Sequence, residues 1–149
     1  VLDSFQAGLS WSTILNKREN FRKAFDNFDA VKISKYKDAK IEKLLLDPGI
    51  IRNRLKVIAT VSNAKAFLAI QKEFGSFDKY IWQFTKGKVL KNKWKSSNQV
   101  PAKTKESDEM SKDLYARGFK FVGSTICYAY MQAAGMVDDH VSGCFRRSN

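Results

Sequence analysis

The stretch LLLDPGIIRNRLKVIA (residues 44–59) joins two helical patterns through a tight turn. Pro48 and Gly49 break helices, so the first helix must end near Asp47. Beyond the turn, apolar residues recur at helical spacing from about Arg52 to Phe74. We expect the inner face of this second helix to be formed by Leu55, Ile58, Ala59 and Ser62. The stretch therefore predicts a corner between two helices near the middle of the chain.

The remaining chain also favours helices, because it shows almost no period-2 alternation of apolar residues. We expect helices in WSTILNKRENFRKAFDNF (11–28), SFDKYIWQF (76–84) and the uncharged FVGSTICYAYMQAAG (121–135). In the first of these, one face would carry Trp11, Ile14, Leu15, Phe21 and Phe25. Helix caps are expected at Asp29, Asp38, Ser76 and Ser107. The predicted fold class is all-α, in a single domain over residues 1–149.

One segment departs from this pattern. The stretch KGKVLKNKWKSSNQVPAKTKE (86–106) is polar, basic and interrupted by Pro101. It predicts a long surface loop, which Trp94 would anchor to the core.

The composition of the chain limits its class. Of 149 residues, 44% are hydrophobic and 28% charged, which is typical of a folded protein. No stretch approaches the roughly 20 apolar residues that cross a bilayer, so we expect no membrane partner. Two cysteines that do not look like a disulfide framework fit a reduced, intracellular protein. The start at Val1, without Met, leads us to expect that an N-terminal segment is missing. The net charge of +12 would attract a polyanion.

The turn of the opening stretch resembles a helix-hairpin-helix element, which binds DNA phosphate without reading sequence. Gly49 and Ile50 would form the hairpin. The amides that begin the second helix favour an anion, and Arg52, Arg54 and Lys56 stand beside them. The usual pattern has a second glycine where this chain has Ile51. The alternative interpretation is a plain helical corner with solvated arginines.

The stretch DSFQAGLSW (3–11) contains groups that a base-flipping enzyme needs. Asp3 and Gln6 could read the edge of an extruded base, and Trp11 could stack on it. Gly8 is flexible, and Leu9 could be the apolar wedge that holds the gap in the duplex open. Alternatively, Leu9 and Trp11 belong to the core and Asp3 caps a helix.

The C-terminal stretch DDHVSGC (138–144) holds His140 and Cys144, two zinc ligands by type. A structural zinc site needs four ligands. Cys127 lies within an apolar helix and is expected to be a core residue, and no other histidine exists. The other interpretation is that His140 is hydrogen-bonded within the fold and lies beside a cysteine that binds no metal.

These stretches occur together and in order. With GIIRNRLKVIATVSNAKAF (49–67) and RGFKFVGSTICYAYMQAAGMVDDHVSGC (117–144), they resemble the DNA-3-methyladenine glycosylase I family from Asp3 to Cys144. The QAGLSW and GFKFVG blocks are the most specific. The resemblance implies an all-α, helix-hairpin-helix fold with a structural Zn²⁺ site that ties the termini. His140 and Cys144 would be two of its ligands, and the other two are expected upstream of Val1.

The resemblance also implies an activity: excision of 3-methyladenine from alkylated double-stranded DNA by hydrolysis of the N-glycosidic bond, which leaves an abasic site. Trp11 matches the stacking tryptophan, and Asp3 matches a base-contacting carboxylate that is usually Glu. Gly8 and Leu9 match the loop that enters the duplex. We expect Gln6 and Tyr128 in the base pocket. Because residues 118–135 hold no Asp or Glu, the reaction would depend on a leaving base that alkylation has made cationic.

Two rival hypotheses remain open. The chain could be a non-enzymatic helix-hairpin-helix module that binds DNA, or an inactive fragment. For the glycosylase, the resemblance implies a monomer and a cytoplasmic location of bacterial type.

Overall fold

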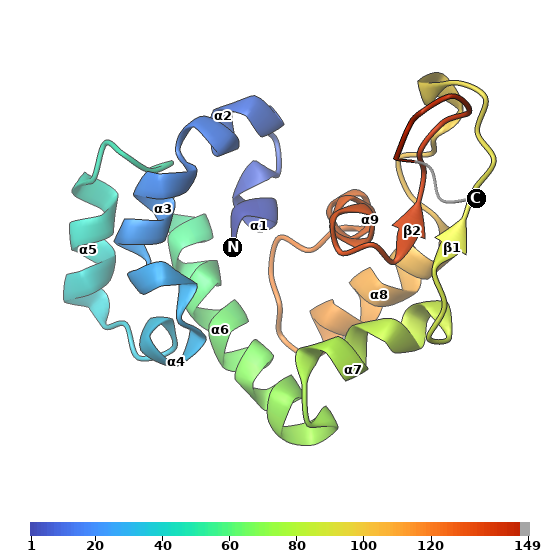
Figure 1. The fold of residues 1–149 in the computed structure, drawn as a ribbon. Helices are drawn as coiled ribbons and strands as arrows, with labels where there is room; N and C mark the ends of the chain where they lie inside the picture. The colour runs from blue at the N-terminus through green and yellow to red at the C-terminus, as the bar shows by residue number, and fades with distance from the viewer. Residues whose placement is uncertain (147–149) are drawn as a thin grey trace.

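The computed structural model describes residues 1–146 and is mostly helical, which confirms the predicted helical class. Figure 1 shows the elements. In chain order they are α1 (Leu2–Gln6), α2 (Trp11–Asn16), α3 (Arg18–Ala24), η1 (Asp26–Phe28), α4 (Ala30–Ile33), α5 (Asp38–Leu46), α6 (Arg54–Phe74), α7 (Phe77–Trp82), η2 (Gln83–Thr85), β1 (Leu90–Lys91), η3 (Ser97–Gln99), α8 (Lys105–Ala116), α9 (Ser124–Ala133) and β2 (Val137–Asp138).

The helices form two lobes with separate hydrophobic cores, joined by the long helix α6 (Figure 1). The first lobe comprises α1 to α5, and its core centres on Phe5, whose ring lies 4.7 Å from that of Phe21. The second lobe comprises α7 to α9, and its core includes Tyr80 and Met131. Because α6 contributes Val57 to the first core and residues as far as Ile70 to the second, it fixes one lobe against the other.

The predicted break between the two helices of the opening stretch is confirmed. Asp47 ends α5, and its Oδ1 accepts a hydrogen bond from the amide of Gly49 at 2.7 Å. A side chain at Gly49 would meet the Cβ of Asn20 at 3.1 Å, which explains the glycine. Asn53 then caps α6, because its Oδ1 accepts from the amide of Lys56.

Two of the predicted helix caps are confirmed: Asp29 caps α4, and Ser76 caps α7. The other two were misplaced. Lys37 is the N-cap of α5, and Asp38 is its first helical residue. Thr104 caps α8, with Ser107 as its reciprocal partner three residues later.

The inner face predicted for α6 was wrong in part. Leu55 is 69% exposed and Ile58 is 44% exposed, whereas Lys56 and Val57 are buried. Lys56 can face inward because its ammonium donates to carbonyl oxygens in α1 and just after it, so α6 is rotated relative to the predicted face.

The face predicted for residues 11–28 was also wrong in part. Leu15 and Trp11 are exposed, whereas Ile14, Phe21 and Phe25 are buried as expected. The segment forms two helices that meet at Lys17, so a single helical period does not continue through it.

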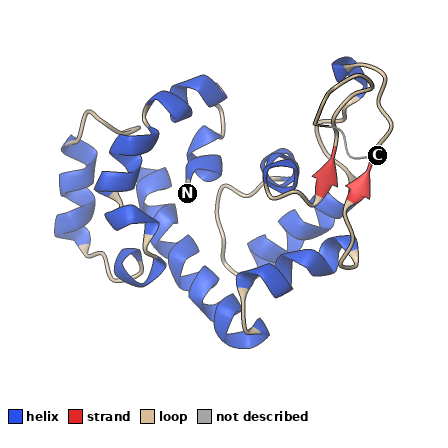
Figure 2. Cartoon of the chain, in the orientation of Figure 1, coloured by secondary structure: helices blue, strands red, loops and turns tan. Residues whose placement is uncertain are grey.

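The predicted surface loop is held more firmly than its composition indicates. Within it, β1 pairs in parallel with β2, as the arrows in Figure 2 show. The indole of Trp94 donates to Oδ1 of Asp139 at 2.7 Å, which confirms the anchoring role of Trp94. Each strand has only two residues, so neither is long enough to show the alternation of apolar and polar residues that predicts a strand. None of the helices within residues 1–146 combines the length and apolarity that crossing a membrane requires.

Candidate active site

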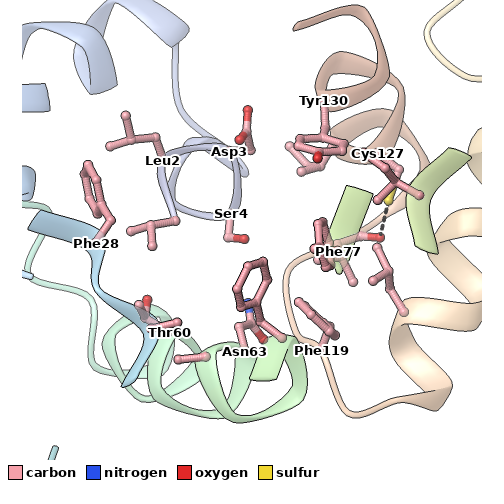
Figure 3. A pocket seen from close by; sticks show the side chains of 18 of the residues that line it. Leu2, Asp3, Ser4, Phe28, Thr60, Asn63, Phe77, Phe119, Cys127 and Tyr130 are labelled. Carbon is pink, nitrogen blue, oxygen red and sulfur yellow. Dashed lines mark hydrogen bonds between the residues drawn. The ribbon is translucent and has the colours of Figure 1, made fainter. Parts of the chain in front are cut away.

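A cavity of about 480 Å³ lies between the two lobes. Its walls are mostly apolar and include the rings of Phe67, Phe77 and Phe119 (Figure 3). Its polar lining residues are Asp3, Ser4, Thr60, Asn63 and Tyr130. An apolar cavity with a few polar groups is the usual form of a site for a small organic ligand.

Asp3 on α1 and Tyr130 on α9 lie across from each other in this cavity (Figure 3). Burial raises the pKa of the Tyr130 phenol, and the negative charges of Asp3 and Asp78 raise it further. The phenol therefore stays protonated at neutral pH and can donate a hydrogen bond. Asp3 offers the carboxylate that the sequence predicted for contact with a base.

Tyr128 does not line this cavity, so its place in the base pocket stays a prediction. It is 2% exposed, and its hydroxyl donates to Oδ2 of Asp139 at 2.5 Å. Residues two positions apart on an α-helix point about 200° apart, so Tyr130 faces the cavity when Tyr128 faces away from it. In an uncharged helix, no local signal distinguishes the two tyrosines.

Gln6 also lies outside the lining of this cavity, so its place in the base pocket stays a prediction too. Its Nε2 donates to the carbonyl of Leu9 at 3.2 Å, so it closes the turn between α1 and α2. Gly8 in this turn has a φ of 75°, which favours glycine, and Leu9 is 37% exposed. An exposed leucine at a glycine turn has the form of the expected wedge.

Trp11 follows this turn and is 43% exposed, but it does not line the cavity. Its stacking role therefore stays a prediction.

Lys56 was predicted to contact DNA, and its burial contradicts this. Its Nζ donates to the carbonyl oxygens of Phe5, at 2.8 Å, and Ala7, at 2.5 Å. It also lies 5.9 Å from the centre of the Phe121 ring. Burial lowers the pKa of the ammonium. Lys56 thus ties the α1–α2 turn (residues 7–10) to α6.

The hairpin between α5 and α6 exposes only part of the predicted phosphate site. Arg52 is exposed, and Ile50 is buried in the first core. Arg54 makes two hydrogen bonds to the carboxylate of Glu42, at 2.6 and 2.8 Å. This pairing lowers the pKa of Glu42 and directs Arg54 along α5.

The GFKFVG segment (118–123) is held against α6 by Asn63. The side chain of Asn63 accepts from the amide of Lys120 at 2.8 Å and donates to its carbonyl at 3.0 Å. Phe121 in this segment has a φ of 55°, which is unfavourable for an aromatic residue. The clamp therefore holds a strained segment beside the cavity.

Asp139 is the centre of a second polar cluster. Its carboxylate accepts four hydrogen bonds, which come from the side chains of Asn92, Trp94, Tyr128 and Gln132. Burial alone would raise the pKa of Asp139, but these bonds outweigh burial and lower it. Because both oxygens are engaged, Asp139 is poorly placed to act as a base.

His140 and Cys144 lie together after β2, with Nδ1 and Sγ 3.6 Å apart. Two ligands of one tetrahedral Zn²⁺ ion would be separated by about 3.5 Å. Among residues 1–146, however, no group of three or more His, Cys, Asp or Glu side chains could hold a metal ion. Cys127 is buried, and its Sγ donates to the carbonyl of Val122, as expected for a core residue. Burial raises its pKa to about 12.

Comparison with known proteins identifies the family of this chain. A family model for methyladenine glycosylase matches residues 1–147. The chain belongs to the methyladenine glycosylase family. It is 45% identical to DNA-3-methyladenine glycosylase 1 of Escherichia coli over 143 residues, which is 96% of this chain and 76% of that protein. It is 46% identical to DNA-3-methyladenine glycosylase of Haemophilus influenzae, over 96% of this chain and 77% of that one.

Solved structures give the same result. A crystal structure of 3-methyladenine DNA glycosylase I has a TM-score of 0.95 and 46% identity, and the match covers 99% of this chain and 81% of that one. The glycosylase I of Staphylococcus aureus, from a study of 3-methyladenine recognition, has a TM-score of 0.95 and 33% identity, over 99% and 79% of the two chains.

Within this methyladenine glycosylase fold, the structure brings together Asp3, Tyr130 and Asn63, of which the sequence predicted only Asp3. The two missed residues come from α6 and α9, far from Asp3 in the chain. A polar residue at every fourth helical position is common, so spacing alone could not identify them.

Proposed function

We propose that this protein excises 3-methyladenine from alkylated double-stranded DNA by hydrolysing the N-glycosidic bond, which leaves an abasic site. The observation that carries the proposal is the carboxylate of Asp3 on an otherwise largely apolar cavity between the lobes. The family membership and the named relatives support the choice of substrate.

The chemistry requires little more than positioning and charge. Alkylation at N3 makes adenine a cation and therefore a good leaving group. The anionic Asp3 stabilises that cation within apolar walls, where electrostatic interactions are stronger than in water. Tyr130 offers a hydrogen bond from a phenol that stays protonated. Normal bases are neutral and gain none of this stabilisation, so we expect little action on them.

Access to the cavity requires that the damaged nucleotide leave the duplex. Leu9 would enter the gap, as apolar wedges do, with the turn before it shaped by Gly8. Trp11 would stack on the extruded base. The hairpin at Gly49, with Arg52, would hold a backbone phosphate near the first amides of α6.

We also propose a structural zinc ion bound by His140 and Cys144. The chemistry and the 3.6 Å separation of the two side chains support this. Two further ligands would complete a closed site, in which no position is left for a reactive water. The ion would therefore stabilise the fold and take no part in hydrolysis.

The direct test is base release from methylated duplex DNA, measured by chromatography of the freed bases. The protein should release 3-methyladenine, and Asp3→Asn should lower the rate by about 10²-fold or more, because the carboxylate acts on charge in the transition state. Asp3→Glu should retain activity.

Asp38→Asn is the matched control, because Asp38 is an exposed carboxylate at the start of α5, away from the cavity. Release that is undiminished in Asp3→Asn would refute the role of Asp3. DNA binding without any release would instead favour a non-enzymatic DNA-binding module.

A further inference from the structure

The loop of residues 86–104, which ends where α8 begins, has an unusual charge. It contains six lysines and no Asp or Glu. The proposed chemistry uses none of these lysines. In the view of Figure 1, the part of this loop beyond β1 reaches the upper edge of the molecule, where the α1–α2 turn and the α5–α6 hairpin also lie.

The lysines in the first part of this loop are presented in a regular way. From Leu90 to Lys95, half-buried and exposed residues alternate strictly. The half-buried positions are Leu90, Asn92 and Trp94, and the exposed positions are Lys91, Lys93 and Lys95. We call the three exposed residues the lysine ladder. Alternation of this kind is expected when an extended chain turns one face to the protein and the other to solvent.

The inward face is fixed by hydrogen bonds. The amide of Leu90 donates to the carbonyl of Met136 at 2.9 Å, and that of Asn92 donates to the carbonyl of Asp138 at 3.0 Å. The side chains of Asn92 and Trp94 both donate to Asp139. The ladder is therefore mounted on a fixed backbone, which lowers the entropy lost when a partner binds.

The spacing of the ladder suits one class of partner. Alternate residues of an extended chain are about 6.7 Å apart. Phosphates of one B-DNA strand rise about 3.4 Å each along the axis while they wind around it, so neighbouring phosphates lie about 7 Å apart in space. The ladder therefore matches consecutive phosphates of one strand. We propose that the lysine ladder is a second DNA-backbone contact, separate from the α5–α6 hairpin, which binds the duplex beside the lesion. The identity of the polyanion rests on the proposed function.

The test is the salt dependence of binding to an undamaged duplex of about 20 base pairs, measured by fluorescence anisotropy. Each phosphate that a lysine neutralises contributes about 0.9 to the slope of log K against log salt. Changing Lys93→Gln and Lys95→Gln together should lower the magnitude of the slope by about 1.8. Between 50 and 200 mM salt, the wild type should lose about 12-fold more affinity than this variant.

Lys32→Gln together with Lys35→Gln is the matched control. These two exposed lysines lie in and just after α4, on the other side of the molecule from β1 (Figure 1). The control removes the same net charge and should leave the slope unchanged. Equal losses of slope in both variants, or no loss in the ladder variant, would overturn the proposal.

Base release at low salt separates this inference from the proposed function. Both variants should release 3-methyladenine at the wild-type rate under saturating DNA. A reduced slope in the ladder variant, combined with no base release by the wild type, would uphold the ladder and refute the glycosylase activity. Base release by the wild type, combined with an unchanged slope in the ladder variant, would uphold the glycosylase activity and refute the ladder.

Discussion

At the scale of single residues, Lys56 shows how a charged side chain can stabilise the fold. Its ammonium is buried and donates to two main-chain carbonyls at the end of α1. Because α1 ends at Gln6, no further helical turn supplies amides that would donate to these carbonyls. Lys56 therefore replaces the missing helical partners and sets the position of the turn that carries Leu9.

Replacing Lys56→Met should destabilise the protein and impair flipping of the base. Loss of the two hydrogen bonds should lower the free energy of unfolding by about 1–3 kcal/mol, because buried carbonyls would be left unsatisfied. Release of 3-methyladenine from duplex DNA should fall more than release from single-stranded DNA, since only the duplex requires the wedge. Urea unfolding and base-release rates measure the two effects.

The control for this change is Lys65→Met, because Lys65 is an exposed lysine on the same helix. It should leave both quantities near those of the wild type. If Lys56→Met slowed release from both kinds of DNA equally, the positioning role would be refuted and a general loss of folded protein would explain the result.

At the scale of elements, Asp139 joins three parts of the chain that local sequence does not connect. Its partners lie on the loop after β1 and on α9, while Asp139 itself follows β2. The parallel pairing of β1 with β2 depends on the same junction. The two strands alone are too short to be stable, so this carboxylate contributes much of what holds them together.

This carboxylate should make stability depend on pH in the acid range. The pKa of Asp139 in the folded state lies below its unfolded value of about 3.9. Its contribution to stability is therefore complete above pH of about 4 and is lost as the pH falls through the folded-state pKa. Urea unfolding of the wild type between about pH 6 and pH 2 should show this loss.

In Asp139→Asn the loss below about pH 4 should be smaller. Its stability at neutral pH should be lower by about 1–3 kcal/mol, because one amide oxygen cannot accept four hydrogen bonds. If this variant lost as much stability below about pH 4 as the wild type, other carboxylates would account for the acid sensitivity. One such carboxylate is Asp113, with its partners Tyr80 and Arg117.

At the scale of the whole molecule, α6 connects two lobes and the cavity lies between them. The lobes thus place Asp3, from the beginning of the chain, beside α9 near its end. The proposed zinc ion belongs to this scale too, since it would connect the segment after β2 to ligands elsewhere.

Zinc should protect one cysteine and leave the other unaffected. Without metal, a thiol reagent should label Cys144, which is half-exposed, and should spare Cys127, which is buried with a pKa raised to about 12. Added Zn²⁺ should slow the labelling of Cys144, and His140→Ala should remove that protection. Labelling of the native protein followed by mass spectrometry gives the result. Equal rates with and without Zn²⁺ would contradict the proposed site.

Local sequence was enough to predict the features that depend on neighbouring residues: the helical class, the break at Pro48 and Gly49, the caps at Asp29 and Ser76, and the choice of Asp3 as a candidate site residue. Each follows from backbone geometry or side-chain chemistry within a few residues. Three other features became visible only in the packed fold: Lys56 faces inward, Tyr130 and not Tyr128 lines the cavity, and Asp139 holds the basic loop. These depend on contacts between residues 11 to 51 positions apart, for which helical periodicity contains no information.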